Sequence, residues 1–511
     1  MAYKMFAAIY VGSSELGMKI YEISSKKTFK QVDGVSQIIE LGKDTYSKGA
    51  LQIDTIASVC EILNGFKEKM KEYQVTEYKA YATSAVREAD NTEVVLDAIK
   101  RNTGLLVKVL SNSEQRFINF SGLVAKYDNF HQVVSKNTAF VDIGAGSVQV
   151  SIFDKNNLVI TENIPIGAVR IRDYISMIGT KAGKLDKLLA DYVENDIANF
   201  RNIYLNDKEI KNIIAVGEGA NLVKRLIPDL DVSEKIDRKQ FENMYKIIIS
   251  NTPEQLAERF GIPYERATLM LPSVIIYQSF LNNCKAEEVY VPRVDFCEGI
   301  VAYNLAEGSR NLFEHDFEED IIASAYNICK RYKCGHTHVD RVSDFALKIF
   351  DSVKKVHCMG KRERLQLQIA AILHECGNFI SLNDGARCSY FIVANTEIIG
   401  LSHKERMEIA NIVKYNMVNL PSRTEIINEL GDCDYILIAK LTAILRIANT
   451  LDKSHKERIE DISVSIKDNN MIITAKTFED ISLEVGLFEG KADAFEKVYG
   501  IRPVLRTKRG V

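Results

Sequence analysis

The stretch "TAFVDIGAGSVQVSIF", residues 138–153, decides how the chain folds. An apolar run ends in Asp142, a turn follows with Gly144 and Gly146, and apolar and polar residues then alternate from Val148. Alternation with a period of two predicts a strand, and the apolar run before the glycines predicts another. The stretch therefore predicts a β-hairpin that holds a single carboxylate against a glycine turn.

The N-terminus has the same layout. In "MFAAIYVGSSELGMKIYEI", residues 5–23, an apolar strand is followed by a turn with Gly12 and Gly17 and by a second strand with Met18 and Ile20. The two β-turn-β units lie roughly 130 residues apart. We therefore expect a duplicated α/β fold with two similar halves.

The rest of the chain divides by its hydrophobic pattern. Residues 53–73 have the spacing of a helix, and "KNIIAVGEGANLVKRL", residues 211–226, predicts a strand, a glycine turn and a helix. Long amphipathic helices run from about Leu305 to about Asp452, and residues 462–486 return to alternating strands around an Asn-Asn turn. We predict four regions: an α/β half at 1–125, a second at 126–304, a helical domain at 305–455, and a small α+β domain at 456–511.

The composition excludes several classes of protein. The 511 residues are 46% hydrophobic and 26% charged, which is typical of a globular protein, and the formal net charge of −3 argues against binding nucleic acid through bulk charge. Nine cysteines without a CxxC pair indicate neither a disulfide framework nor a zinc knuckle. The apolar run near the N-terminus is too short for a signal peptide, and no run reaches about 18 apolar residues. We expect a cytoplasmic protein that binds neither nucleic acid nor membrane.

A strand that ends in an acid and turns through glycines can hold a metal–phosphate pair. Glycines let backbone N–H groups approach phosphate oxygens, while a carboxylate binds Mg²⁺. One such turn is equally typical of an ordinary hairpin. Its repetition at Gly12-Ser13 and at Gly217-Glu218-Gly219 favours a phosphate-binding cleft between the two halves.

Six motifs, in their order along the chain, resemble those of the exopolyphosphatase / guanosine pentaphosphate phosphohydrolase (Ppx/GppA) family. They are "YATSAVREADN" (81–91), "VLSNSEQRF" (109–117), "FVDIGAGSVQV" (140–150), "IPIGAVRI" (164–171), "AVGEGA" (215–220) and "ERATLMLPS" (265–273). The resemblance extends over essentially the whole chain. It implies two ribonuclease-H-like halves of the actin and sugar-kinase type, a helical third domain similar to HD-type phosphohydrolases, and homodimers. The implied activity is the release of terminal phosphate from inorganic polyphosphate or pppGpp.

The resemblance also assigns residues. It implies that Asp142 is the Mg²⁺ ligand. Loop glycines, hydroxyls and arginines would bind the phosphates: Gly12, Ser13, Arg87, Gly144, Gly146, Ser147, Gly217, Gly219 and Arg266. Without the motifs, either arginine would be interpreted as a solvated or ion-paired surface residue.

This chain departs from the family pattern at several positions. Tyr10 stands where the family has an aspartate in the first loop, and Gln115 stands at the catalytic glutamate, although the preceding Glu114 is retained. Gln149 replaces the glutamate that ends the aspartate–glycine motif, and Ala145 replaces its middle glycine. Three carboxylates that the family would place in the cleft are thus neutral side chains here.

The departures leave two main hypotheses open. An amide cannot take a proton from water, and the loss of a general base costs roughly 10²–10⁴ in rate. Phosphoryl transfer depends mainly on positioning and electrostatics, however, and some GTPases use a glutamine to orient the attacking water. The chain is therefore either a Mg²⁺-dependent phosphohydrolase in which Gln115 and Glu114 serve catalysis, or a weak or inactive member that binds polyphosphate or an alarmone as a sensor. A kinase of the sugar-kinase/actin superfamily is a third possibility, which ATP-dependent transfer to an acceptor would reveal.

The helical region carries the remains of an HD-type site, which needs several His and Asp ligands around a metal. "HTHVDRV" offers His336 and His338, and "LHECGNF" offers His374 and Glu375. Two positions where related sequences tend to carry histidine hold other residues, Cys388 and Asn416. Because the neighbours of His374 are mostly apolar, we expect it to be a packed core residue and expect no working metal site.

Overall fold

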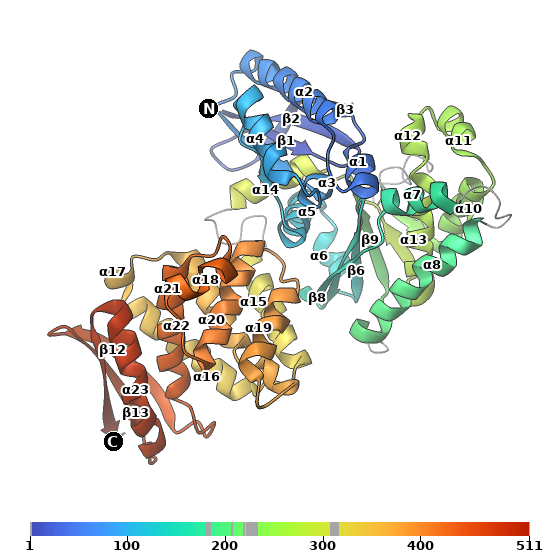
Figure 1. Cartoon of the computed structure of the whole chain (residues 1–511). Coiled ribbons are helices and arrows are strands. Elements are labelled where there is room, and N and C mark those ends of the chain that lie inside the picture. The colour runs from blue at the N-terminus through green and yellow to red at the C-terminus, as the bar shows by residue number, and fades with distance from the viewer. Residues whose placement is uncertain are drawn as a thin grey trace. The chain divides into compact units, whose positions relative to one another are not determined.

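A computed structural model describes residues 3–178, 185–205, 208–217, 220, 234–306 and 316–509 (Figure 1). The chain divides into two compact units, Met1–Asp320 and Ile321–Val511. The finer boundaries expected after residues 125, 304 and 455 stay predictions. Each unit has a hydrophobic core of its own, and each is described by itself.

The first lobe of the first unit is built on a five-stranded sheet with the order β3-β2-β1-β4-β5. Its strands are β1 (Lys4–Val11), β2 (Glu15–Ile23), β3 (Phe29–Ile38), β4 (Glu77–Ala82) and β5 (Lys108–Val109). β1, β2 and β3 form an antiparallel meander, and β4 and β5 continue the sheet parallel to β1. The turn between β1 and β2 is closed by the Gly12 N–H, which donates to the Glu15 carbonyl at 2.9 Å.

The second lobe is built on a six-stranded sheet with the order β10-β11-β9-β6-β7-β8. Its strands are β6 (Thr138–Ile143), β7 (Val148–Asp154), β8 (Asn157–Ile164), β9 (Asn212–Val216), β10 (Lys235–Asp237) and β11 (Glu288–Tyr290). β6, β7 and β8 again form an antiparallel meander, and the Gly144 N–H donates to the Ser147 carbonyl at 2.9 Å. Both predicted β-turn-β units are therefore present, and each turn is closed by the same backbone bond.

Alternation along β1 divides the first sheet between two helical layers (Figure 1). Ala7 and Ile9 face one layer, and Phe6 and Ala8 face the other. The first layer contains α2 (Ile53–Glu72) and α4 (Thr92–Thr103), and the second contains α5 (Asn112–Lys126) and α14 (Phe296–Ala306). α14 follows the second lobe in sequence, but it packs on β1 and α5 and so adds to the core of the first.

The remaining helices of this unit are shorter or belong to the second lobe. Near the first sheet lie α1 (Leu41–Lys48) and α3 (Ser84–Arg87), whereas α6 (Phe130–Val134) contacts the second sheet, where the Val133 carbonyl accepts from Thr138 and Asn212. The second lobe contains α7 (Ala168–Ile178), α8 (Leu185–Phe200), the π-helical turn η1 (Arg201–Leu205), α10 (Arg238–Ile249), α11 (Pro253–Phe260), α12 (Tyr264–Ala267) and α13 (Met270–Cys284). Apolar residues of β6 and β7 pack with these helices into one core.

The second unit combines helices with a small sheet. The helices are α15 (Phe317–Arg331), α16 (His336–Ser352), α17 (Lys354–His357), α18 (Lys361–Leu373), η3 (Cys376–Phe379), α19 (Gly385–Asn395), α20 (His403–Met417), α21 (Arg423–Leu430), α22 (Tyr435–Thr450) and α23 (Ser482–Tyr499). The sheet has the order β12-β13-β14, with β12 (Ile459–Lys467), β13 (Asn470–Thr477) and β14 (Arg502–Arg509). Residues of β12, β13 and α23 share one hydrophobic core with the preceding helices.

One strand prediction in this unit is wrong. The alternating strands predicted over residues 462–486 include Leu483 and Val485, but α23 begins at Ser482. Leu483 and Val485 are exposed, and the helix instead buries a later set of residues at helical spacing: Phe488, Ala492, Phe495 and Tyr499. The helical period of these four residues outweighs the short alternating run before them.

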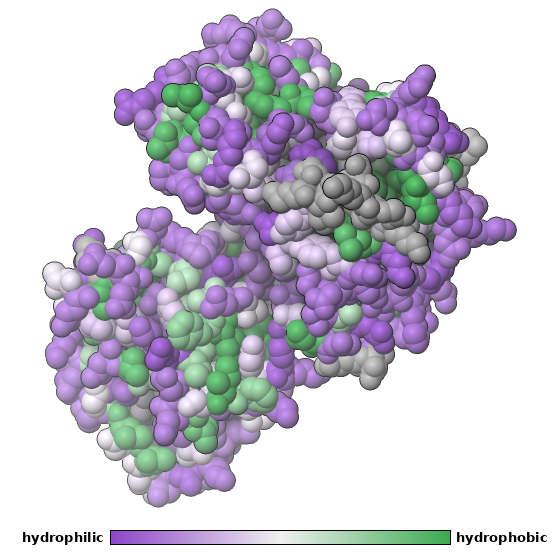
Figure 2. Space-filling model, turned by 45° about the vertical axis from the view of Figure 1, so that its right-hand side comes forward, coloured by the Kyte–Doolittle hydropathy of each residue, from purple (hydrophilic) through white to green (hydrophobic). Residues whose placement is uncertain are grey.

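The surface shown in Figure 2 is mainly hydrophilic, and its hydrophobic residues lie in separate groups. Among the described residues, no helix combines the length and the apolar character that crossing a membrane requires. Scattered apolar residues of this kind are normal on a globular protein.

Candidate functional site

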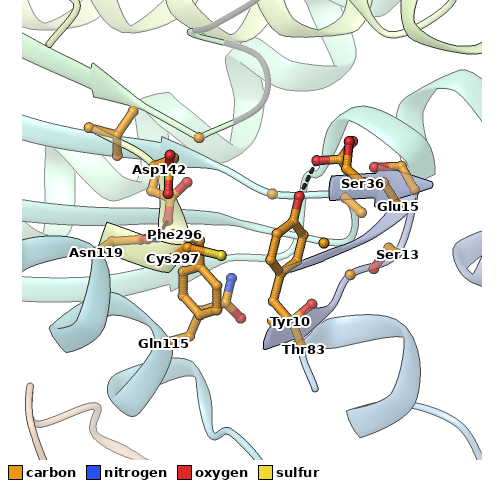
Figure 3. A pocket seen from close by; sticks show the side chains of 18 of the residues that line it. Tyr10, Ser13, Glu15, Ser36, Thr83, Gln115, Asn119, Asp142, Phe296 and Cys297 are labelled. Carbon is orange, nitrogen blue, oxygen red and sulfur yellow. Dashed lines mark hydrogen bonds between the residues drawn. The ribbon is translucent and has the colours of Figure 1, made fainter. Parts of the chain in front are cut away.

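A cavity of about 760 Å³ in the first unit is lined by residues of both lobes (Figure 3). The lining includes Gly12 and Ser13 from the first glycine turn and Gly144 from the second. Asp142 and Gln115 also line it, and a smaller adjoining cavity shares both of them. The two glycine turns therefore border one cavity.

Asp142 is held at the end of β6 by a buried environment. Asp142 is only 4% exposed, yet it lines the cavity (Figure 3). Asn119 of α5 donates a hydrogen bond to its carboxylate. Burial raises the pKa of Asp142 to about 6, and the Asn119 hydrogen bond and the charge of Arg116 oppose that rise. A carboxylate in this setting is stabilised by any cation that reaches it.

Gly217, at the end of β9, leaves room for the Asp142 carboxylate. Its φ of +86° lies in the left-handed region, and a Cβ at this position would overlap an oxygen of Asp142. Only glycine combines that backbone conformation with so close an approach. Gly219, predicted as its partner in phosphate binding, lies outside the described residues.

The residues around Asp142 suit a Mg²⁺ ion. Gln149 stands opposite Asp142 in the β6–β7 pairing, and both line the smaller cavity. The Gln149 Oε1 atom is buried and has no hydrogen-bond partner in the described part of the chain. Carboxylate and amide oxygens are the hard ligands that Mg²⁺ takes in proteins, usually together with water and substrate phosphate. Asp142 and Gln149 would hold the ion here.

Gln115 is presented to the cavity as a hydrogen-bond donor. Arg87 Nη1 donates to Gln115 Oε1 at 3.3 Å and to the Leu110 carbonyl at 2.8 Å. Because a guanidinium only donates, the amide oxygen must be the end of Gln115 that faces Arg87. The NH₂ group of Gln115 is left to bind an acceptor in the cavity, such as a phosphate oxygen.

Glu114 has a structural part in this arrangement. Its carboxylate accepts from the Ser111 backbone N–H at 2.9 Å and from Lys108 Nζ at 2.6 Å, and it forms a capping box at the start of α5. Glu114 lines neither cavity. The prediction of a catalytic role for Glu114 gains no support, but its cap fixes the first turn of α5, which carries Gln115.

Among the predicted loop residues, Ser13 and Ser147 line a cavity and Gly146 does not. Ser13 Oγ accepts from the Ala85 N–H at 3.1 Å and lines the main cavity, and Ser147 lines the smaller one together with Arg87. Gly146 lines neither cavity, because its backbone packs against Tyr46, where a Cβ would lie 2.8 Å from the hydroxyl. Gly146 thus shapes the turn without facing the cavity.

Two ion pairs put carboxylates into the cavity that the sequence analysis missed. Arg266 of the second lobe donates to Glu15 of the first, and the Tyr10 hydroxyl also donates to Glu15 (Figure 3). Lys19 pairs with Asp295 in the same lining. Two acids, Glu15 and Asp295, therefore line the cavity at positions other than the three neutral ones, and Arg266 is already paired with one of them.

The sequence analysis missed Asn119 and Glu15, and only the first of these could have been predicted from a local pattern. Asn119 lies one helical turn after Gln115, and residues four apart share a helix face, so a helical reading of residues 112–126 could have found it. Glu15 pairs with a residue 251 positions away, and no local pattern announces such a contact.

A matched pair of substitutions tests the close approach at Gly217. In Gly217→Ala the left-handed backbone costs about 1–2 kcal/mol, and the new methyl group also displaces the Asp142 carboxylate. Gly261→Ala is the control, because Gly261 has a φ of +59° with no heavy atom within 4 Å of an added Cβ. Calorimetry should show a larger loss of stability for Gly217→Ala, which alone should lose Mg²⁺-dependent polyphosphate binding. Equal losses in both variants would contradict this role.

The raised pKa of Asp142 predicts a pH-dependent stability in EDTA. The unfolded chain releases this proton near pH 4, whereas the folded chain keeps it until about pH 6. The free energy of unfolding should therefore fall as pH rises through this window, by on the order of 3 kcal/mol. In Asp142→Asn that decline should be missing, so the variant gains stability relative to wild type between pH 4 and pH 7 in calorimetric scans. Parallel curves for the two proteins would show that Asp142 does not titrate in this way.

Comparison with protein families identifies two segments of the chain. Residues 19–307 match the Ppx/GppA phosphatase family, and residues 322–486 match domain III of the Ppx/GppA phosphatases. Together they cover well over half of the 511 residues. The resemblance predicted from the motifs is confirmed.

Curated relatives share a low identity with this chain. A guanosine-5'-triphosphate,3'-diphosphate pyrophosphatase of Photobacterium profundum is 18% identical over 477 residues, which cover 92% of this chain and 91% of that protein. A bifunctional 3-dehydroquinate synthase/phosphatase of Fusobacterium nucleatum is 24% identical over 316 residues. That match covers 58% of this chain but only 46% of the Fusobacterium protein.

Solved structures share the fold. An exopolyphosphatase from Cytophaga hutchinsonii matches with a TM-score of 0.53 and 18% identity, covering 60% of this chain and 99% of that one. The Aquifex aeolicus member of the Ppx/GppA family matches with a TM-score of 0.50 and 19% identity, covering 60% and 100%. The predicted two-lobed, actin-like α/β architecture with a helical C-terminal part is confirmed, whereas the similarity to HD-type phosphohydrolases stays a prediction. The chain belongs to the Ppx/GppA phosphatase family.

Proposed function

We propose that this protein binds the terminal phosphoryl groups of inorganic polyphosphate or pppGpp in the cavity between its lobes and releases terminal phosphate with Mg²⁺. One observation carries the proposal: the buried Asp142 carboxylate lines the cavity, and the Gly217 backbone lies directly against it. The names of the relatives, a pppGpp pyrophosphatase and an exopolyphosphatase, support this class of substrate. The choice between the two substrates, the metal and the expected homodimer all belong to the proposal.

Five side chains that line the two cavities have a proposed role in binding the metal or the phosphate. Asp142 and Gln149 hold the metal, which neutralises phosphate charge and orients the terminal group. Arg87 lines the smaller cavity, where it balances charge that develops on the phosphate. The Gln115 NH₂ group donates to a phosphate oxygen, and the Arg266 guanidinium becomes available when phosphate displaces Glu15.

The orientation of Gln115 favours a second candidate, a binding protein that turns over slowly or not at all. Gln115 Oε1 accepts a hydrogen bond from Arg87, and an amide oxygen cannot take up the proton of an attacking water as a carboxylate would. Among the described residues that line the smaller cavity, Asp142 is the only carboxylate. A sensor of polyphosphate or alarmone needs the binding groups but no base.

Phosphate release from long-chain polyphosphate and from pppGpp distinguishes the two candidates. We expect slow Mg²⁺-dependent release by the wild type and a rate roughly 10²–10⁴ times higher in Gln115→Glu, which restores a base. Asp142→Asn should abolish both release and Mg²⁺-dependent binding. A silent wild type that binds either ligand tightly supports the sensor, and an active wild type that is unchanged by Asp142→Asn contradicts the site assignment. ATP with an acceptor in the same assay tests for kinase activity.

The pairing of Glu15 with Arg266 predicts a gain of affinity on substitution. Glu15→Gln keeps an acceptor for the Tyr10 hydroxyl but removes the charge that competes with phosphate for Arg266, so polyphosphate affinity should rise by up to about tenfold. Glu40→Gln is the control, because Glu40 pairs with Arg172 of the second lobe at 2.8 Å but does not line the cavity. Calorimetric titration at two salt concentrations measures both variants. Equal effects of the two substitutions would mean that Glu15 does not compete with the ligand.

A further inference from the structure

The second unit places two cysteines at the C-terminal end of α15. Cys329 lies in the last turn of the helix, and Cys334 follows the end of the helix by three residues. Both are free thiols, and neither lines the phosphate cavity of the first unit. Cys329 is fully buried, whereas Cys334 is partly exposed. The pair therefore combines a thiol that solvent reaches with one that it does not.

A Schellman motif at the end of the helix brings these two residues together. Lys333 has a φ of +50°, in the left-handed region, and reverses the chain there. The Cys334 N–H donates to the Cys329 carbonyl at 3.0 Å, and the Lys333 N–H donates to the Lys330 carbonyl at 3.2 Å. In this motif the side chain after the left-handed residue commonly packs on the last turn of the helix. The backbone thus holds Cys329 and Cys334 as neighbours.

The two thiols also contact each other. The Cys329 thiol donates a hydrogen bond to the Cys334 sulfur, and this bond lowers the pKa of Cys334 and raises that of Cys329. A disulfide requires two Cα atoms roughly 4.4–6.8 Å apart with side chains directed at each other. Two residues joined by a backbone hydrogen bond and by their thiols meet this requirement without rearrangement of the turn.

A third thiol lies nearby but has a different partner. Cys376 of η3 is fully buried, and its charge would influence both Cys329 and Cys334. Its own sulfur accepts a hydrogen bond from the Ser389 hydroxyl. Oxidants react with thiols that are exposed and ionised. Of these three cysteines Cys334 is the one that an oxidant reaches, and Cys329 is the thiol in contact with it.

We propose that Cys334 and Cys329 form a reversible redox site, in which a hydroperoxide oxidises Cys334 and Cys329 then closes a disulfide. With hydrogen peroxide, the Cys334 sulfur attacks one oxygen, the O–O bond breaks, and a sulfenic acid and one water form. The Cys329 sulfur displaces the hydroxyl group of that sulfenic acid, which leaves with the thiol proton as a second water. The two thiols give up two electrons, and the peroxide takes them. An excess of a small thiol reverses the step by exchange and is itself oxidised to a disulfide.

Oxidation of the full chain with about one equivalent of hydrogen peroxide tests the proposal. The protein is then alkylated, denatured and digested with trypsin, which cuts after Lys330, Arg331 and Lys333. Mass spectrometry should find residues 311–330 linked to residues 334–341, and dithiothreitol should remove the link. Cys334 should react roughly tenfold faster than Cys433, which is also partly exposed but whose thiol faces the Lys404 carbonyl.

Three substitutions separate the roles of the thiols. Cys334→Ser should abolish the link and leave Cys329 unmodified, and this partly exposed position tolerates a serine even if the buried Cys329→Ser fails to fold. A folded Cys329→Ser should stop at the sulfenic acid of Cys334, which dimedone labels. Cys376→Ser is the matched control for a buried cysteine and should still form the link. The absence of the linked peptides in the wild type, a link from Cys334 to Cys376, or equal reaction of Cys334 and Cys433 overturns the proposal.

Discussion

The burial of the Asp142 carboxylate is the physical constraint on which the candidate site in the first unit depends. An ionised carboxylate away from water is costly, and this cost raises its pKa to about 6. A hydrogen bond from Asn119 and the nearby charge of Arg116 offset only part of it. The divalent cation proposed for this site would offset the rest of that cost.

The two lobes contribute unequal parts to this site. The second lobe supplies Asp142 and the glycine backbone against it, and the first supplies Gln115 and Arg87. The ion pair between Glu15 and Arg266 joins the lobes across the same cavity, and in it Glu15 neutralises the guanidinium charge of Arg266. In the proposed function, a terminal phosphate replaces that internal carboxylate, so binding exchanges one anionic partner of Arg266 for another. This exchange links occupancy of the cavity to the contact between lobes.

Local patterns predicted the parts of the fold that local sequence determines. The alternation after Gly144 and the glycine turns identified both hairpins, and the position of Asp142 at a strand end identified the central side chain. The strand expected near Leu483 was wrong because a short alternation coincided with the exposed apolar residues at the start of α23, whose buried apolar residues begin at Phe488. The pairing of Glu15 with Arg266 depends on a contact between distant segments, which no periodicity within one segment encodes.

The position of a bound metal relative to Asp142 tests the central claim most directly. Crystals grown with Mn²⁺ and a short polyphosphate, with anomalous scattering recorded at the manganese edge, locate the ion without reference to turnover. Our account predicts a manganese peak within coordination distance of the Asp142 carboxylate or of a water bound to it, with a phosphate beside the Gly217 backbone. A fully occupied peak elsewhere in the cavity, with Asp142 still bonded only to Asn119, would contradict it.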